Sequence, residues 1–337
     1  MLSDRRQRVL AALIEEYVAC ALPVGSRTLT ERYQLGVSPA TVRNELSVLE
    51  DGGYITQPHT SAGRIPTDIG YRAFVDSLLE TGFSGDEESG RTAVDELRRS
   101  ASELDALLEQ TSSALTRLTD CLSIVLAPSV LNLHIKQLSL ISLTLHRALV
   151  VLVTEDGQVF NRQIDFAEPV SPDELAHVQA FLGDVFTGKS LQQIEEGLEW
   201  GMMEALHDPL VRLVLEEVLS CLQESELSRT HRLGVSSLLT KPEFSQSQVL
   251  LPVMQVLEDD TVLLHLLDDA VRQADGAPCV RIGRENDAAE LAGVSVVASR
   301  YGRGESAGVV AVIGPTRMDY SKVIRAVRIA SAALQDV

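Results

Sequence analysis

The stretch SRTLTERYQLGVSPATVRNELSVLEDGGYITQPHTSAGR, residues 26–64, decides how the chain begins to fold. Ser38 is a favoured N-cap, and Pro39 suits the first position of a helix. Apolar side chains then recur at the spacing of one buried helix face: Val42, Leu46 and Leu49. Gly52 and Gly53 supply a stop. The stretch therefore predicts a helix-turn-helix, in which the second helix enters the major groove of DNA.

The outward positions of the second helix carry side chains that can read bases. With the apolar face turned inward, four polar residues lie on or beside the outer face: Thr41, Arg43, Asn44 and Ser47. Arginine can donate two hydrogen bonds to guanine, asparagine pairs with adenine, and threonine contacts phosphate or a thymine methyl group. The amino end of the helix, at Ser38, also favours phosphate. An ordinary helical hairpin with a polar surface fits the same spacing, so the helices alone leave both interpretations open.

A short hairpin follows the second helix directly. Residues 54–55 are typical of a strand, residues 56–63 (TQPHTSAG) of a polar loop, and residues 64–65 of a returning strand that Pro66 ends. A β-hairpin in this place is a wing, and Arg27, ahead of the turn, is expected to meet a phosphate. The wing residues expected to reach the DNA backbone or the minor groove are His59, Thr60, Ser61 and Arg64.

Three motifs closely resemble one known family, the heat-inducible transcription repressors called HrcA. HTSAGRIPTDIGYRAFVD (residues 59–76) is similar to the wing and following helix of that family. VRIGREND (280–287) and GVVAVIGPTRMDYSKVIRAV (308–327) are similar to its C-terminal pattern, with a looser likeness at 233–245. The resemblance implies an α+β multidomain fold: an N-terminal winged helix-turn-helix and a GAF-like α/β domain with an inserted helical dimerisation domain.

The same resemblance implies a negative regulator of heat-shock chaperone operons. Such a repressor binds double-stranded DNA as a homodimer, at an inverted-repeat operator of the CIRCE type. It is released on heat stress, and a GroEL-type chaperonin restores its activity. The family implies no enzyme activity and no cofactor. Two rivals are a winged-helix repressor gated by a small ligand in the GAF-like domain and, less favoured, a P-loop NTPase with a DNA-binding module.

Composition shifts suggest the domain boundaries. GFSGDEESG (residues 82–90) is a linker that closes a DNA-binding domain over residues 1–82. The GAF-like domain is expected over 91–187 and 247–337, with a long connecting helix over 91–126, and the inserted dimerisation domain over 188–246. Leucines recur at helical spacing along 91–126, which fits either a coiled coil between protomers or a helix lying on a domain.

Apolar patterns predict most of the remaining elements. Three strands are expected at 133–145, 147–157 and 158–166, the second and third forming a hairpin. A helix begins at Ser171-Pro172 with four apolar residues on one face: Leu175, Val178, Leu182 and Val185. Towards the C-terminus we expect a helix over 249–258, a strand over 261–267, and a buried strand over 309–313 that is followed by a turn at Gly314-Pro315.

GDVFTGKS (residues 183–190) matches the phosphate-binding P-loop pattern GxxxxGK[ST]. A P-loop requires a strand before it, however, and the segment before Gly183 has helical periodicity. We therefore expect Gly188 to end that helix and Ser190 to cap the next one. The P-loop interpretation is weaker than this structural one.

The formal charge of −19 in 337 residues argues against a general coat for nucleic acid. Residues 1–80 are nearly neutral, with 8 basic and 10 acidic residues, so the acidity lies in the rest of the chain. DNA binding therefore has to rest on a few specific groups. The four cysteines and seven histidines are scattered without the spacing of a metal site, and no apolar run is long enough to span a membrane. We expect a cytoplasmic protein with reduced thiols.

Overall fold

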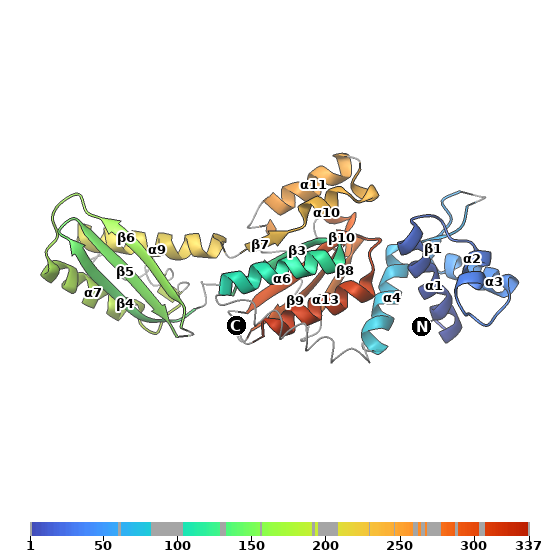
Figure 1. Ribbon diagram of the computed structural model, residues 1–337, viewed down its shortest axis with the longest axis horizontal. Coiled ribbons are helices and arrows are strands. Elements are labelled where there is room, and N and C mark those ends of the chain that lie inside the picture. The colour runs from blue at the N-terminus through green and yellow to red at the C-terminus, as the bar shows by residue number, and fades with distance from the viewer. Residues whose placement is uncertain are drawn as a thin grey trace. The chain divides into compact units, whose positions relative to one another are not determined.

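The computed structural model describes most of the chain, and the described residues divide into two compact units (Figure 1). The described ranges are 2–59, 62–81, 104–128, 133–155, 157–190, 193–194, 208–228, 230–245, 247–258, 262–263, 267, 278–286, 289–302 and 307–335. The first unit consists of Met1–Leu126, His231–Tyr301 and Val309–Val337, and the second of Ala127–Thr230 and Gly302–Gly308. The expected linker over 82–90 lies outside the described residues.

The first unit begins with a winged helix-turn-helix. Its elements are α1 (Asp4–Cys20), α2 (Ser26–Arg32), α3 (Pro39–Asp51), the hairpin strands β1 (Ile55–Thr56) and β2 (Ile65–Pro66), and α4 (Asp68–Thr81). The two strands pair in antiparallel fashion, as expected for a wing. The predicted inner face of α3 is confirmed, because its three apolar residues are at most 1% exposed: Val42, Leu46 and Leu49. They pack with residues of α1 and α2 that are equally buried, including Leu10, Leu13 and Leu29.

A five-stranded sheet forms the centre of the rest of this unit (Figure 1). In spatial order its strands are β7 (Thr230–Leu233), β3 (Leu122–Leu126), β10 (Gly308–Pro315), β9 (Val294–Tyr301) and β8 (Cys279–Ile282). One face buries its side chains against α10 (Val235–Leu239), the 3₁₀ turn Pro242–Phe244 and α11 (Ser247–Glu258). The helices α6 (Leu104–Thr119) and α13 (Tyr320–Ala333) pack together and against β3 and β9. Because helices cover the central strands, the sequences of these strands are continuous apolar runs.

Two expectations about these elements are wrong. The helix expected to reach residue 126 ends at Thr119, since Asp120 adopts a left-handed backbone (φ 51°) and residues 122–126 form β3. All five residues of β3 are buried, so the run carries no exposed face that would distinguish a strand from a helix. Residues 262, 263 and 267, expected in a strand, are helical. Leu263 and Leu267, four positions apart in the sequence, are both fully buried.

Strand β10 also runs through Gly314 and Pro315, where a turn was expected, and the turn follows at residues 316–318. The buried strand over 309–313 is confirmed, with register partners in β3. The described part of the long leucine-rich helix lies on the sheet domain, with Leu108 and Leu115 buried. This agrees with the second of the two interpretations left open for it.

The second unit has a sheet and a core of its own. Strands β4 (Ile135–Thr144), β5 (Arg147–Thr154) and β6 (Val159–Asp165) form an antiparallel sheet in that order, as the three predicted strands require. The helices α7 (Pro172–Phe186) and α9 (Pro209–Ser228) contribute to the same apolar core. The predicted face of α7 is buried, and Ser171 with Glu174 forms a capping box at its start.

The second unit is an insertion that begins at Ala127 and contains a β-sheet besides helices. The boundaries expected for an inserted dimerisation domain, 188–246, stay a prediction. Strands β4–β6 bury one side on α7 and α9. The chain leaves the five-stranded sheet after β3 and re-enters it at β7, the neighbouring strand, which brings the two ends of the insertion together. Among the described residues, no helix is both long and apolar enough to cross a membrane.

Candidate nucleic-acid interface

Helix α3 presents the predicted outer face. Arg43, Asn44 and Ser47 are exposed, and Thr41 is half-buried. The start of the helix is fixed by Ser38, whose Oγ accepts a hydrogen bond from the backbone N–H of Thr41 at 3.2 Å. Ser38 is thus engaged as the N-cap, while its own exposure keeps it at the surface where phosphate would bind.

On one flank of α3, the hairpin is tied to the helix by Arg64. Its Nε and Nη2 both donate to Oε2 of Glu50, at 3.2 and 3.0 Å. The backbone of Arg64 also pairs with Val24, between α1 and α2. The side chain of Arg64 is only 21% exposed. The residue expected to contact DNA therefore holds the wing against the recognition helix in this conformation.

On the other flank, a second carboxylate of α3 holds two arginines of α1. Glu45 is 6% exposed, and its two oxygens accept hydrogen bonds from Arg5 Nε (2.7 Å) and Arg6 Nε (3.0 Å). Desolvation raises the pKa of Glu45, but the hydrogen bonds from Arg6 and Arg5 outweigh it, and the net shift is downward. We did not anticipate Arg5 and Arg6 from the sequence. An acidic residue beside Leu46 at an inward helix position was the available signal.

The remaining predicted residues are less constrained. Arg27 is exposed, and its Nε forms an i, i+4 ion pair with Glu31 at 2.8 Å. His59 is exposed at the tip of the hairpin, where its carbonyl accepts a hydrogen bond from Ala62 N–H at 2.8 Å. Thr60 and Ser61 lie outside the described residues. The structure thus brings Arg43, Asn44 and Ser47 onto one surface, with arginines along both edges.

Polar contacts anchor the winged helix to the sheet domain within the first unit. Arg72 of α4 donates to both oxygens of Glu285 and to the carbonyl of Val280. Arg317, which follows β10, donates from Nε to Glu243 at 2.5 Å and from Nη1 to the carbonyl of Val18 in α1 at 2.7 Å. These bonds fix α1 and α4, and through them they support α3.

Aromatic packing lies beside these bonds. The rings of Tyr71 in α4 and Tyr320 in α13 are tilted, with centroids 5.6 Å apart. Burial raises the pKa of both phenols, so both stay protonated at neutral pH. The hydroxyl of Tyr320 donates to or accepts from Ser295 at 2.7 Å, whereas that of Tyr71 is buried without a partner among the described residues.

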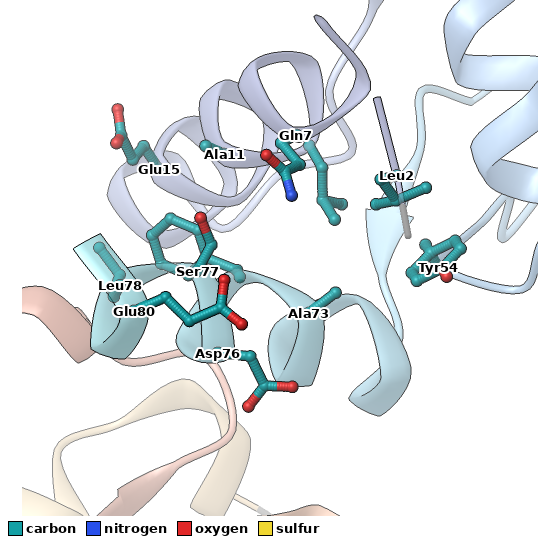
Figure 2. A pocket seen from close by; sticks show the side chains of 12 residues that line it. Leu2, Gln7, Ala11, Glu15, Tyr54, Ala73, Asp76, Ser77, Leu78 and Glu80 are labelled. Atoms are coloured by element: carbon teal, nitrogen blue, oxygen red, sulfur yellow. The ribbon is translucent and has the colours of Figure 1, made fainter. Parts of the chain in front are cut away.

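A cavity of about 370 Å³ lies between α1 and α4 (Figure 2). Its lining combines apolar side chains, among them Leu10, Phe74 and Leu78, with three carboxylates: Glu15, Asp76 and Glu80. Desolvation, and then the charge of Asp319, raise the pKa of Glu15. The rival interpretation of a ligand-gated repressor places its small-molecule site in the GAF-like domain, whereas this cavity belongs to the winged helix.

The structure does not support the P-loop interpretation of residues 183–190. Residues 183–186 are the last turn of α7, so no strand precedes the motif. Gly188 has a left-handed backbone (φ 76°) just after the helix, and Ser190 Oγ accepts from Gln193 N–H at 3.3 Å. The motif is a helix end followed by a cap, as the helical periodicity predicted. No group of three or more histidine, cysteine or acidic side chains suited to a metal occurs in the described part.

Comparison with known proteins agrees with this architecture. The family described as HrcA protein C terminal domain matches residues 105–324. The heat-inducible transcription repressor HrcA of Streptomyces avermitilis is 41% identical over 333 residues, which cover 97% of this chain and 96% of that protein. The repressor of the same name from Acetivibrio thermocellus is 33% identical over 340 residues, covering 99% and 96%.

One solved structure has the same fold throughout. The crystal structure of a hypothetical protein at 2.2 Å resolution is 26% identical, with a TM-score of 0.69 over 99% of this chain and 98% of that one. Three observations lead to one assignment: the winged helix, the family match over residues 105–324, and relatives that match over nearly the whole chain. The chain belongs to the HrcA family of heat-inducible transcription repressors.

Proposed function

We propose that this repressor binds, as a homodimer, an inverted-repeat operator of the CIRCE type in front of heat-shock chaperone operons. Each protomer places α3 in the major groove of one half-site, with Arg43 and Asn44 at the base edges and Thr41 and Ser47 beside them. Heat stress lowers the fraction of competent dimer and frees the operator, and a GroEL-type chaperonin restores binding.

The observation that carries this proposal is the outer face of α3. Arg43, Asn44 and Ser47 are all exposed, while the opposite face is closed by fully buried apolar residues. An arginine and an asparagine side by side can read guanine and adenine through paired hydrogen bonds. The helix is also held at its N-cap, so it presents these side chains in a fixed orientation.

The charge of the chain favours specific binding over loose attachment. The formal charge is −19, and Arg27 and Arg64 are each paired with a carboxylate. Few phosphates are therefore neutralised by each protomer, and non-specific affinity is low. A symmetric dimer binds two half-sites at once, so two modest contributions to the binding free energy, one from each α3, add up to specific binding of the operator.

A gel-shift titration tests the central claim. The freshly folded protein is titrated against inverted-repeat promoter DNA with a scrambled competitor, alongside Arg43→Ala. Arg117→Ala is the matched control, because Arg117 is an exposed arginine of α6 and its loss changes the charge equally. We expect specific binding that Arg43→Ala reduces by roughly 10- to 100-fold, while Arg117→Ala leaves it unchanged. Equal binding of operator and scrambled DNA contradicts the proposal.

Brief heating tests the switch separately. DNA affinity should fall after heating and return only when a GroEL-type chaperonin and ATP are supplied. An affinity that is the same before and after heating counts against release by unfolding, and it leaves the DNA-binding claim intact.

A further inference from the structure

The two edges of the outer face of α3 are built alike. Glu45 and Glu50 border it on opposite sides, about 140° apart around the helix axis across the buried face. Glu50 holds Arg64 of the wing, and Glu45 holds Arg5 and Arg6 of α1. The recognition helix therefore has guanidinium groups along both sides, which come from elements before and after it in the chain.

We propose that Arg5 and Arg6 bind DNA phosphates along the edge of the major groove opposite the wing. This inference rests on the proposed function, because it adds contacts to the same surface. It assigns a DNA-binding role to the amino end of α1. The phosphates are those next to the base pairs read by Asn44, since positions 44, 45 and 48 lie on the same side of α3.

The hydrogen bonds to Glu45 leave donors available. Each guanidinium uses its Nε for this contact, and the side chains of Arg5 and Arg6 remain 58% and 37% exposed. An arginine fork has further N–H groups that suit phosphate oxygens. The contact with Glu45 restricts both side chains before DNA arrives, so less rotamer entropy is lost on binding.

The number of charges at this edge shows that Arg5 and Arg6 do more than neutralise the Glu45 carboxylate. One arginine is sufficient to balance the Glu45 carboxylate, but two are present; Arg8 offsets the neighbouring Asp4, which leaves one net positive charge at this end of α1. At the wing edge, Arg64 and Glu50 balance each other. In a chain of net charge −19, an uncompensated cation beside the reading helix is suited to an anionic ligand.

The salt dependence of DNA affinity tests the proposal. The logarithm of the association constant falls with the logarithm of salt concentration, with a slope of about −0.9 for each phosphate contacted. Removing both arginines while Glu45 is kept leaves a buried carboxylate without a cation, which destabilises the domain. We therefore compare Glu45→Gln with the triple variant Arg5→Ala/Arg6→Ala/Glu45→Gln, which differ only in the two cations.

For each half-site, the triple variant should show a slope smaller in magnitude by about 1.8 than Glu45→Gln. Its affinity should be on the order of tenfold lower for each lost contact, on operator and scrambled DNA alike. Arg147→Ala is the matched control, because Arg147 is an exposed arginine of the second unit that is likewise paired with a carboxylate, that of Asp165. The salt dependence of DNA binding by Arg147→Ala should have the same slope as that of wild type.

The outcomes keep the two proposals apart. If wild type binds the operator specifically and the triple variant has the same slope as Glu45→Gln, the phosphate role of Arg5 and Arg6 is overturned and the repressor proposal stands. If wild type shows no specific binding at any salt concentration, the repressor proposal itself fails. An unchanged circular dichroism spectrum shows that the triple variant is folded. A smaller salt slope in this folded variant than in Glu45→Gln supports the inference.

Discussion

Arg64, immediately before the returning strand β2 of the hairpin, donates two hydrogen bonds to one oxygen of Glu50 in the last turn of α3, at 3.2 and 3.0 Å. The backbone N–H and carbonyl of Arg64 also pair with Val24, at 2.8 and 2.9 Å. One residue thus connects the wing, the recognition helix and the segment between α1 and α2. Position and orientation of the wing depend on this connection.

Replacing Glu50 separates two roles for Arg64. If Arg64 acts by holding the wing, Glu50→Gln and Arg64→Ala should weaken operator binding by similar factors, each roughly 3- to 10-fold. The expected loss of stability is about 1 kcal/mol, because the pair is only partly exposed. Fluorescence anisotropy with labelled operator measures the affinity. Tighter binding by Glu50→Gln, with Arg64→Ala still weak, would instead place Arg64 on a phosphate.

The N-cap of α3 gives a second prediction. Ser38→Ala removes the acceptor for Thr41 N–H and should cost about 1 kcal/mol of stability. Ser38→Asp keeps a cap and should restore stability, but its negative charge should repel phosphate and lower DNA affinity. Thermal unfolding and anisotropy on the same samples measure the two effects. If Ser38→Asp binds DNA as well as wild type does, Ser38 is distant from the phosphates.

Local signals explain how much of this fold could be predicted from sequence. The cap at Ser38, the capping box at Ser171 and the inward spacing of α3 each involve residues within one or two helical turns. Short-range rules of this kind place helix starts well. The wing and the hairpin of β5 and β6 followed from turn residues in the same way.

Two of the wrong expectations concern short apolar runs. All five residues at 122–126 are buried, and among the described residues of 261–267 Leu263 and Leu267 are buried, so periodicity over so few positions cannot separate a strand from a helix. The arginines at Glu45 were missed for a different reason. Arg5 and Glu45 are 40 positions apart, and only the packing of α1 on α3 brings them together. Arg317 and Val18 are likewise far apart in the sequence, by 299 positions, and only the fold brings them together.

The anchor at Arg317 carries a third prediction. Its side chain is 15% exposed and bonded to Glu243 and to the carbonyl of Val18. Arg317→Ala leaves a largely buried carboxylate without its cation, so we expect a loss of about 2 kcal/mol. Hydrogen exchange should rise in the last turn of α1. Arg212→Ala, which breaks an exposed i, i+4 pair, is the control and should change stability by less than about 0.5 kcal/mol.

Acid should weaken the contact at Glu45. Because the folded-state pKa is lowered, this carboxylate stabilises the protein above its unfolded pKa of about 4.3, and the contribution is lost as pH falls through the folded pKa. Between pH 7 and pH 3, wild type should therefore lose more stability than Glu45→Gln. Calorimetric melting at a series of pH values measures the difference. Glu109→Gln, at an exposed position of α6, should follow wild type throughout.

Two glycines in helices should respond in opposite directions to alanine. A Cβ on Gly70 in α4 would lie 2.0 Å from the carbonyl oxygen of Tyr54, a backbone atom that cannot turn aside. Gly70→Ala should therefore move α4 away from the base of the wing, with a cost of at least about 2 kcal/mol and weaker DNA binding. The melting temperature and the operator affinity should fall together.

Gly183 in α7 is the matched case, because a Cβ there meets nothing within 4 Å. Alanine has the higher helix propensity, so Gly183→Ala should raise stability by roughly 0.5–1 kcal/mol and leave DNA affinity unchanged. The same variant alters the first glycine of the P-loop-like sequence. A loss of nucleotide binding on Gly183→Ala would contradict the assignment of this segment to an ordinary helix end.

Retained stability in Gly70→Ala would show that the backbone contact between α4 and Tyr54 is dispensable.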